Sequence, residues 1–279
     1  MRTFTIKEAL LEASLLLKDM QRPYLEAQIL LSFLLKKDRI DLVVNENKKL
    51  EKEKEYFELV KRRAEYEPLE YITNEVSFYS RKFYIKKGVL IPRPETELLI
   101  DHVLDIIKRY KKPPDIAEIG VGSGIISVII ALFTDDIKIT ATDISTEAIK
   151  CAKINAKKYK VQERISFVNR PYLDTVKQKF DIIISNPPYI ADDFKLDKSV
   201  EKEPKEALYG GKTGDEMLKR IVKIAKEKEA KHLVCEMGYD QKESMEEFFK
   251  KEGIKEYFFY KDLASLDRGF VINFKEKSL

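Results

Sequence analysis

The sequence predicts an α/β protein in which a mostly parallel sheet carries helices on both faces, preceded by a small helical domain. Strand-like and helix-like segments alternate from residue 115 onwards, which is typical of this fold class. One strand-like run ends in the glycine loop 120–124, and a buried-type run ends at the motif Asn186-Pro187-Pro188-Tyr189. Ligands of open α/β sheets bind at the carboxyl ends of strands, so both turns are candidate binding sites.

Residues 1–70 predict a bundle of helices. Thr5 suits the N-cap of a first amphipathic helix, and Pro23 suits the first turn of a second. A charged helix is expected over about 51–64. Mutual packing explains the apolar residues of each helix adequately.

Residues 71–92 change to short aromatic and β-branched runs, which predict a hairpin from strands near 76–79 and 82–85. We expect this hairpin to join two domains. Pro94 then suits the first turn of a helix, with Glu95 and Glu97 near its positive end.

The remainder predicts a sheet and its covering helices. The last strand follows its predecessor after a short link and is therefore expected to be antiparallel. Residues 190–213 form a long irregular stretch of the kind that serves as a lid or a binding loop. Strands are expected near 115–119, 137–142, 164–168, 180–185, 231–236, 255–260 and 268–274, and helices near 124–133, 145–159, 213–228 and 239–252.

Composition narrows the function classes. The 279 residues include 36% charged side chains but carry a net charge of only +4, which is not the footprint of a dedicated nucleic-acid binder. Cys151 and Cys235 lack a CxxC partner and are expected to be free thiols. His102 and His232 lie in ordinary helix and strand contexts, so no metal site is expected. Without a signal peptide or a long apolar run, we expect a soluble cytoplasmic protein with no membrane partner.

The glycine loop and the next strand end predict a nucleoside site. Gly120, Gly122 and Gly124 have Gly-x-Gly-x-Gly spacing, which differs from the Gly-x-Gly-x-x-Gly loop of dinucleotide sites. Such a loop lets the backbone approach a ligand that has no pyrophosphate, although it also occurs as a plain strand–helix turn. Asp143, about 20 residues further on at the next strand end, suits a ribose diol.

The motif Asn186-Pro187-Pro188-Tyr189 suits a planar amino group. The Asn186 side-chain carbonyl can accept one N–H and a backbone carbonyl of the turn can accept the other. The prolines remove competing donors, and Tyr189 offers a flat face for stacking. A turn that merely ends a strand remains the alternative for this motif alone.

Several motifs together resemble those of class I S-adenosylmethionine-dependent methyltransferases. More narrowly, the chain resembles protein-(glutamine-N5) methyltransferases that modify peptide chain release factors, over essentially its whole length. The resemblance includes the two loops above and the segments 90–97 (LIPRPETE), 203–211 (EPKEALYGG), 236–241 (EMGYDQ) and 262–268 (DLASLDR).

The resemblance implies a Rossmann-like fold with a substrate-recognition domain at 1–70, a hairpin linker at 71–92 and a catalytic domain at 93–279. It implies S-adenosyl-L-methionine as the cofactor, S-adenosyl-L-homocysteine as its product, and class I release factors as protein partners, with no stable nucleic-acid partner. It also implies site residues. Asn186, the Pro187 carbonyl, Pro188 and Tyr189 would hold the acceptor amide, and Gly120, Val121, Gly122, Ser123, Gly124, Asn186 and Asp143 would hold the cofactor. Glu118 would receive the cofactor ammonium and Tyr172 would lie near the adenine, although Arg170-Pro171 before it departs from the family pattern.

Three alternatives remain open at this point. An adenine-N6 DNA methyltransferase would use the same Asn-Pro-Pro-Tyr motif, but it would need base-flipping apparatus and usually a basic recognition region. A methyltransferase of ribosomal protein or ribosomal RNA is a related possibility. The last alternative is a non-catalytic nucleoside-binding module, against which two intact loops argue.

Overall fold

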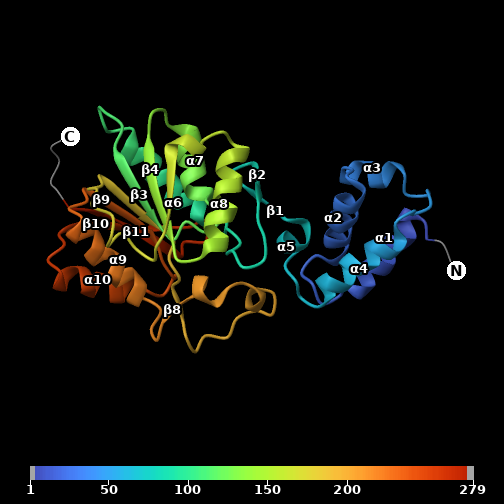
Figure 1. The fold of residues 1–279 in the computed structure, drawn as a ribbon. Coiled ribbons are helices and arrows are strands. Elements are labelled where there is room, and N and C mark those ends of the chain that lie inside the picture. Colours follow the sequence, from blue (N-terminus) through green and yellow to red (C-terminus); the bar gives the residue numbers. More distant parts are fainter. Residues whose placement is uncertain (1–3, 275–279) are drawn as a thin grey trace. The chain divides into compact units, whose positions relative to one another are not determined.

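A computed structural model describes residues 4–274 of the chain and divides it into two compact units (Figure 1). The smaller unit contains the residues up to Glu75 together with Leu196–Lys202. The larger unit contains Val76–Lys195 and the residues from Glu203 onwards. The hairpin expected as a separate linker therefore falls in the larger unit from Val76 on, and a short piece of the 190–213 stretch falls in the smaller one.

The smaller unit is a bundle of short helices. Thr5 caps the first helix as predicted, because its hydroxyl accepts the Glu8 amide at 3.2 Å while the Glu8 carboxylate accepts the Thr5 amide at 2.9 Å. The second helix begins at Pro23, also as predicted. Two further short helices were not predicted. The helices are α1 (Ile6–Leu16), α2 (Pro23–Leu35), α3 (Arg39–Val44), α4 (Glu53–Ala64) and α5 (Leu69–Thr73).

Two buried contacts hold this bundle together. Tyr56 of α4 is fully buried, and its hydroxyl donates to the Ala27 carbonyl of α2 at 3.0 Å. Arg63 of α4 pairs with Glu26 of α2 at 2.5 Å. The Arg63 guanidinium also donates to the Ser199 hydroxyl at 3.2 Å, which attaches the segment 196–202 to the bundle.

A seven-stranded sheet in the order β10-β11-β9-β6-β3-β4-β5 forms the centre of the larger unit. β11 pairs antiparallel with both of its neighbours, as predicted for the last strand, and the other strands from β3 to β9 in this sheet pair in parallel. The strands are β3 (Asp115–Ile119), β4 (Lys138–Asp143), β5 (Ile165–Asn169), β6 (Ile182–Ser185), β9 (His232–Glu236), β10 (Glu256–Lys261) and β11 (Asp267–Asn273).

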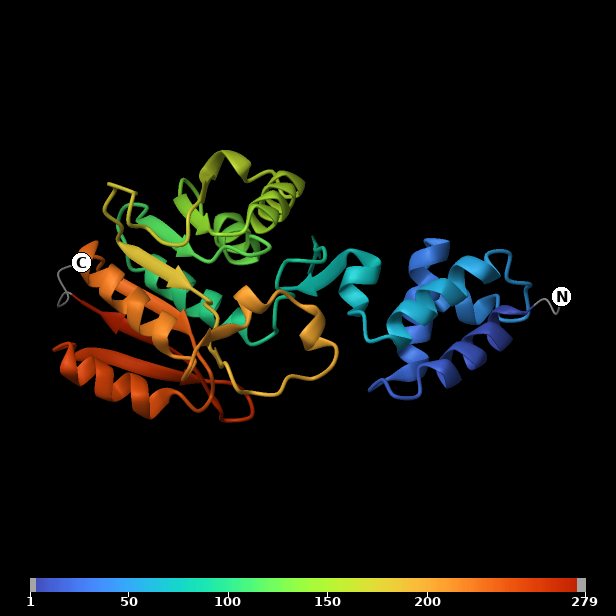
Figure 2. The same ribbon diagram turned by 60° about the horizontal axis from the view of Figure 1, so that its bottom comes forward.

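Helices cover both faces of this sheet, which confirms the predicted α/β class (Figure 2). The apolar faces of α9 and α10 pack in one cluster on one face, whereas α6 contacts α7, and α7 and α8 contact β4 and β5. The helices are α6 (Thr96–Ile107), α7 (Ile125–Phe133), α8 (Thr146–Lys158), α9 (Glu216–Glu227) and α10 (Lys242–Lys251). α6 begins two residues after Pro94, so that proline precedes the helix instead of lying in its first turn.

The stretch 190–213 is less irregular than the sequence predicted. It contains two short paired strands, β7 (Ile190–Ala191) and β8 (Tyr209–Gly211), which are parallel. It also contains two 3₁₀ turns, Val200–Lys202 and Lys205–Ala207. The predicted hairpin is present as β1 (Glu75–Phe78) and β2 (Arg81–Tyr84), one residue earlier than expected. Among residues 4–274, no helix combines the length and the apolar character needed to cross a membrane.

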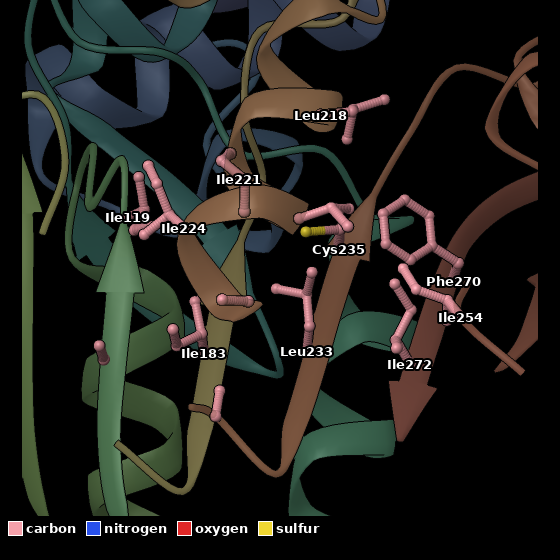
Figure 3. Close-up of a cluster of buried hydrophobic side chains, with 14 of the residues drawn as sticks. Ile119, Ile183, Leu218, Ile221, Ile224, Leu233, Cys235, Ile254, Phe270 and Ile272 are labelled. Atoms are coloured by element: carbon pink, nitrogen blue, oxygen red, sulfur yellow. The ribbon is translucent and has the colours of Figure 1, made fainter. Parts of the chain in front are cut away.

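The apolar core beneath α9 stabilises the register of the strands relative to one another. Buried side chains of β3, β6, β9 and β11 lie together in the cluster of Figure 3, which also includes residues of α9 and α10. The labelled strand residues are Ile119, Ile183, Leu233, Cys235, Phe270 and Ile272, and Ile221 and Ile224 belong to α9. Burial of this apolar surface stabilises the register of the strands, and therefore the position of the turns that follow them.

The register brings the turns after β3, β6 and β9 to one level. Ile119 pairs with Ser185, and Ser185 pairs with Cys235. Gly120 and Asn186 therefore follow directly at neighbouring strand ends. The chain leaves β3 toward β4 on one side and leaves β6 toward β9 on the other, so these two strands form the switch point at which open α/β sheets bind ligands.

Candidate functional site

A cavity of about 530 Å³ opens at this switch point, entirely within the larger unit. Its volume is in the range of small-molecule sites. Residues at or after four strand ends contribute to its wall, and residues 88–90, the segment 204–207 and side chains of α8 and α9 complete it. The sequence-predicted residues that line it are Gly120, Gly122, Asp143, Tyr172, Asn186, Pro187 and Pro188.

The glycine loop is anchored to the next strand. The Gly122 amide donates to the Asp143 Oδ2 at 2.9 Å, and both Gly120 and Gly122 have positive φ angles of 77° and 53°. A Cβ on Gly122 would meet no atom within 4 Å, so open space lies beside this backbone. The loop therefore presents bare backbone to the cavity, as predicted.

Gly124 has a different reason for being glycine. A Cβ at this position would lie 2.8 Å from the Cα of Ala152, so the missing side chain lets α7 pack closely on α8. Val121, Ser123 and Gly124 do not line the cavity. The sequence predicted all three as cofactor residues because a glycine loop does not reveal which of its positions face a ligand.

Asp143 is positioned by two backbone donors. Its Oδ1 accepts the Ser145 amide at 2.8 Å, and its Oδ2 accepts the Gly122 amide at 2.9 Å. Burial raises the pKa of Asp143 above its ordinary value, and the two backbone hydrogen bonds oppose this effect. Each carboxylate oxygen can accept a second hydrogen bond, so the side chain retains capacity for hydroxyl groups of a ligand.

Tyr172 and Pro171 form an apolar wall of the cavity next to Asp143. The Arg220 guanidinium of α9 lies 5.9 Å from the centroid of the Tyr172 ring. The departure from the family pattern at Arg170 and Pro171 therefore does not displace Tyr172 from the cavity wall.

Glu118 does not lie where the sequence predicted. Its carboxylate is fully buried below the first turns of α7, where Oε2 accepts the Ser127 amide at 3.1 Å and also the Ser127 hydroxyl. It does not line the cavity. Its Oε1 has no hydrogen-bond partner, and burial raises the pKa of Glu118 to about 8. These contacts hold the Glu118 carboxylate inside the fold, beneath α7.

The Asn186 side chain lies at the end of β6 in the cavity wall, next to Pro187 and Pro188. Its Nδ2 donates to the Thr96 hydroxyl of α6 at 3.0 Å. The Thr96 hydroxyl in turn donates to Glu236 Oε2 at 2.7 Å. The Asn186 side chain is therefore held by Thr96, which lies 90 positions earlier in the chain.

Tyr189 does not line this cavity, and its stacking on the acceptor amide stays a prediction. Its ring packs against the core cluster under α9, and its hydroxyl donates to Glu236 Oε1 at 3.2 Å. Gln241 fixes the same turn, since its side-chain amide donates to the Tyr189 carbonyl at 2.8 Å and accepts the Gly238 amide at 2.9 Å.

An ion pair with a buried carboxylate connects two of the segments that line the cavity from outside the sheet. Residues 88–90 form one wall, and Pro204, Glu206 and Ala207 belong to the other. Arg93 pairs with Glu203 at 2.5 Å, and the Glu203 carboxylate also accepts the Ile91 amide at 2.9 Å. The Glu203 side chain is only 2% exposed. This ion pair therefore holds the two walls next to each other.

Sequence reasoning missed Thr96, Glu203, Glu236 and Gln241 as parts of the site. All four lie in segments that carried the family resemblance, which was the only signal for them. Their partners lie between 3 and 140 positions away, and spacing in the chain does not reveal such contacts. Within the described part of the chain, no group of three or more His, Cys, Asp or Glu side chains could hold a metal ion.

Two segments of the chain match known family models, and several curated proteins are similar to most of its length. Residues 94–207 match the Methyltransferase small domain, and residues 8–73 match the PrmC N-terminal domain. The release factor glutamine methyltransferase of Clostridium acetobutylicum is 36% identical over 277 residues, which cover 94% of this chain and 96% of that protein. The protein of the same name from Dictyoglomus turgidum is 45% identical over 217 residues, covering 74% of each chain.

Solved structures show the same fold at low identity. The human METTL16 catalytic domain in complex with an RNA hairpin superposes with a TM-score of 0.58 at 18% identity, covering 70% of this chain and 76% of that one. The METTL16 N-terminal domain in complex with S-adenosylhomocysteine gives a TM-score of 0.53, also at 18% identity, with the same coverage. These likenesses confirm the predicted Rossmann-like methyltransferase fold of the larger unit.

Proposed function

The chain belongs to the release factor glutamine methyltransferase family, and from this premise we propose which group it methylates and which residues act. Membership makes the protein an S-adenosylmethionine-dependent methyltransferase. We propose that the acceptor is the side-chain amide nitrogen, N5, of the glutamine in the Gly-Gly-Gln loop of class I peptide chain release factors. The observation that carries this proposal is the hydrogen bond of Asn186 at the end of β6. Its side-chain N–H₂ donates to the Thr96 hydroxyl on the side away from the cavity, which leaves its oxygen to accept from an acceptor amide.

The residues of the cavity fit the methyl donor. Gly120 and Gly122 line the cavity with backbone, and Gly122 has open space beside it, which suits the methionine part. Asp143 has accepting capacity for a ribose diol, and Tyr172 with Pro171 offers an apolar wall for adenine. When bound, S-adenosylmethionine supplies an electrophilic methyl group on a sulfonium.

The protein's own contribution is to orient a weak nucleophile. An amide nitrogen attacks poorly because its lone pair is delocalised into the carbonyl. In this proposal Asn186 Oδ1 accepts one hydrogen of the acceptor amide and the Pro187 carbonyl accepts the other, so that the lone pair is directed at the methyl group. Pro188 limits the freedom of the turn. Good orientation of two reactants contributes about 7–11 kcal/mol to the lowering of a barrier.

The domain roles are part of the proposal. Residues 1–70 would recognise the protein substrate, 71–92 would link the domains and 93–279 would carry catalysis. The match of residues 8–73 to an N-terminal domain that is described as its own family supports a separate role for the helices. A free glutamine could not engage such a domain, whereas an intact release factor could.

Parallel methyl-transfer assays test the proposal. Labelled S-adenosylmethionine is offered with a release factor, the same release factor with its Gly-Gly-Gln glutamine replaced by alanine, DNA and ribosomal protein. We expect label only in the unaltered release factor. Label in DNA or ribosomal protein with none in the release factor would support the alternative acceptors instead. Binding of the cofactor with no transfer to any acceptor would support a binding module.

A further inference from the structure

Two buried residues behind Asn186 determine which way its side-chain amide faces. Thr96 is 2% exposed and Glu236 is 1% exposed, and they reach Asn186 from α6 and from the end of β9. The hydrogen bonds run from Asn186 Nδ2 to Thr96 Oγ1 at 3.0 Å and from Thr96 Oγ1 to Glu236 Oε2 at 2.7 Å. Asn186 lines the cavity, whereas Thr96 and Glu236 do not.

The donor hydrogens available on Asn186, Thr96 and Glu236 allow only one direction for each of the two hydrogen bonds. An ionised carboxylate only accepts, so Glu236 must receive the single hydrogen of the Thr96 hydroxyl. The Thr96 oxygen then has only lone pairs to offer to Asn186. Asn186 must therefore turn its N–H₂ toward Thr96 and its oxygen toward the cavity. The opposite rotamer would place the Asn186 N–H₂ against the N–H₂ of an acceptor amide, two donors facing each other.

Tyr189 stabilises the ionised form of Glu236 at the carboxylate oxygen that Thr96 does not contact. Its hydroxyl donates to Glu236 Oε1 at 3.2 Å, so both carboxylate oxygens are occupied by O–H donors. Hydrogen bonds to an ionised acceptor are about twice as strong as neutral ones, which favours the charged form despite burial. A buried carboxylate is costly to maintain, and a role in fixing an amide direction gives a reason for its presence.

We propose that Thr96 and Glu236 are positioning residues that hold the Asn186 carbonyl toward the acceptor, so that the acceptor specificity of the site is set by a carboxylate that never touches the substrate. The inference rests on the proposed function, since it assumes an amide acceptor at Asn186. It assigns a role to the threonine of segment 90–97 and to the glutamate that opens segment 236–241, neither of which lines the cavity.

The arrangement also implies a dependence on pH. Burial raises the pKa of Glu236 to about 7. Below this pH the carboxylic acid has a hydrogen that it can donate to Thr96, which frees the Thr96 hydrogen for Asn186 and removes the constraint on the amide. The other groups that influence Glu236 are Glu95 before α6, which opposes ionisation, and Arg268 of β11, which favours it. The Tyr260 hydroxyl of β10 and the Tyr189 hydroxyl also lie nearby, and the pKa of each is raised.

The test compares threonine variants in the full chain. Thr96→Val keeps the shape and removes the hydroxyl, whereas Thr96→Ser keeps the hydroxyl. We expect Thr96→Val to lower kcat on a release factor about 10- to 100-fold, as when the partner behind a metal ligand is removed. We expect Thr96→Ser to retain most of kcat, and both variants to bind S-adenosylmethionine like the parent in calorimetry. Thr142→Val is the matched control, because it removes a fully buried hydroxyl of β4 that does not contact Asn186.

Glu236→Gln supplies the second measurement. Parent kcat should rise with pH through about 7, and this rise should be absent in Glu236→Gln, whose side chain does not ionise. A merely structural role would lower the whole profile and leave the rise in place. Parent-like kcat in Thr96→Val, equal losses in Thr96→Val and Thr96→Ser, or a retained rise in Glu236→Gln would each overturn the inference. Failure of the parent itself to methylate a release factor would instead refute the proposed function.

Discussion

Replacement of Asp143 by alanine tests the cofactor end of the cavity most directly. Asp143 accepts the Gly122 and Ser145 amides at 2.9 and 2.8 Å, so its carboxylate is held rigidly before any ligand arrives. A hydrogen bond to a charged acceptor contributes about 1.5–3 kcal/mol. Loss of such a bond to a ribose hydroxyl corresponds to an increase in Kd of about 10- to 150-fold. We therefore expect Asp143→Ala to weaken S-adenosylmethionine binding by at least about tenfold.

Calorimetric titration measures this change, with thermal unfolding recorded on the same samples. Some loss of stability is expected as well, because two backbone amides lose their acceptor, although both lie beside the open cavity, where water can replace it. Asp105→Ala is the control, since Asp105 is an exposed carboxylate of α6 that pairs with Lys108 at 2.8 Å and does not line the cavity. An Asp143→Ala protein that unfolds cooperatively and binds the cofactor with parent affinity would refute the assignment of Asp143 to the ribose.

Three further predictions concern other parts of the larger unit. Asn186→Ala should lower methyl transfer by about 10²–10³, the range for loss of one preorganised hydrogen-bonding group, with little change in the Kd for cofactor. Asn186→Asp should bind the cofactor at least as well as the parent and still transfer poorly, because its charge stabilises the sulfonium ground state; parent-like rates in both variants would contradict the role of Asn186. Gly124→Ala should lower the free energy of unfolding by about 1–3 kcal/mol in urea titrations, because its Cβ would lie 2.8 Å from Ala152 at a φ of 80°; Gly253→Ala, also at positive φ but without a nearby atom, separates backbone strain from this clash. Burial raises the pKa of Glu118 from 4.5 to about 8, so the folded state keeps a proton that the unfolded state loses, and the free energy of unfolding falls as pH rises from about 4.5 to about 8 and is constant above that; Glu118→Gln should show a smaller fall between these two pH values, and an unchanged fall would place the titrating group elsewhere.

The positions of Asn186 and Asp143 at strand ends could be predicted because each depends on a local pattern. The buried run before Asn186 and the strand before Asp143 fix where these strands end, and side chains at the carboxyl ends of parallel strands share one edge of the sheet. The direction of the Glu118 side chain could not be predicted, because the local sequence gives no pattern for it. From Ile116 to Ile119 strand β3 is buried on both faces, so no alternation of polar and apolar residues indicates which way a side chain points.

Contacts between distant segments were beyond the reach of pattern reasoning. Thr96 and Glu236 are separated by 140 positions, and nothing in either local sequence specifies the other as its partner. Tyr189 illustrates the same limit, because the local sequence does not indicate that its hydroxyl bonds Glu236 or that its partly buried ring packs against the apolar cluster under α9. Charge and spacing likewise gave no indication that residues 196–202 pack with the N-terminal helices.

Because Leu196–Lys202 packs with the N-terminal helices, the smaller unit cannot be replaced as one continuous stretch of sequence. The backbone passes from one unit to the other three times, after Glu75, after Lys195 and after Lys202. Deleting the first 75 residues would remove Arg63 and Tyr66, which are the partners of Ser199 and Lys198, and would leave an internal insertion without its scaffold. A single proteolytic nick near residue 75 would not release the helices, since the 196–202 insertion would still hold them by noncovalent packing. Recombination that swaps the helical unit for that of a relative would therefore have to exchange two separate stretches of the gene together.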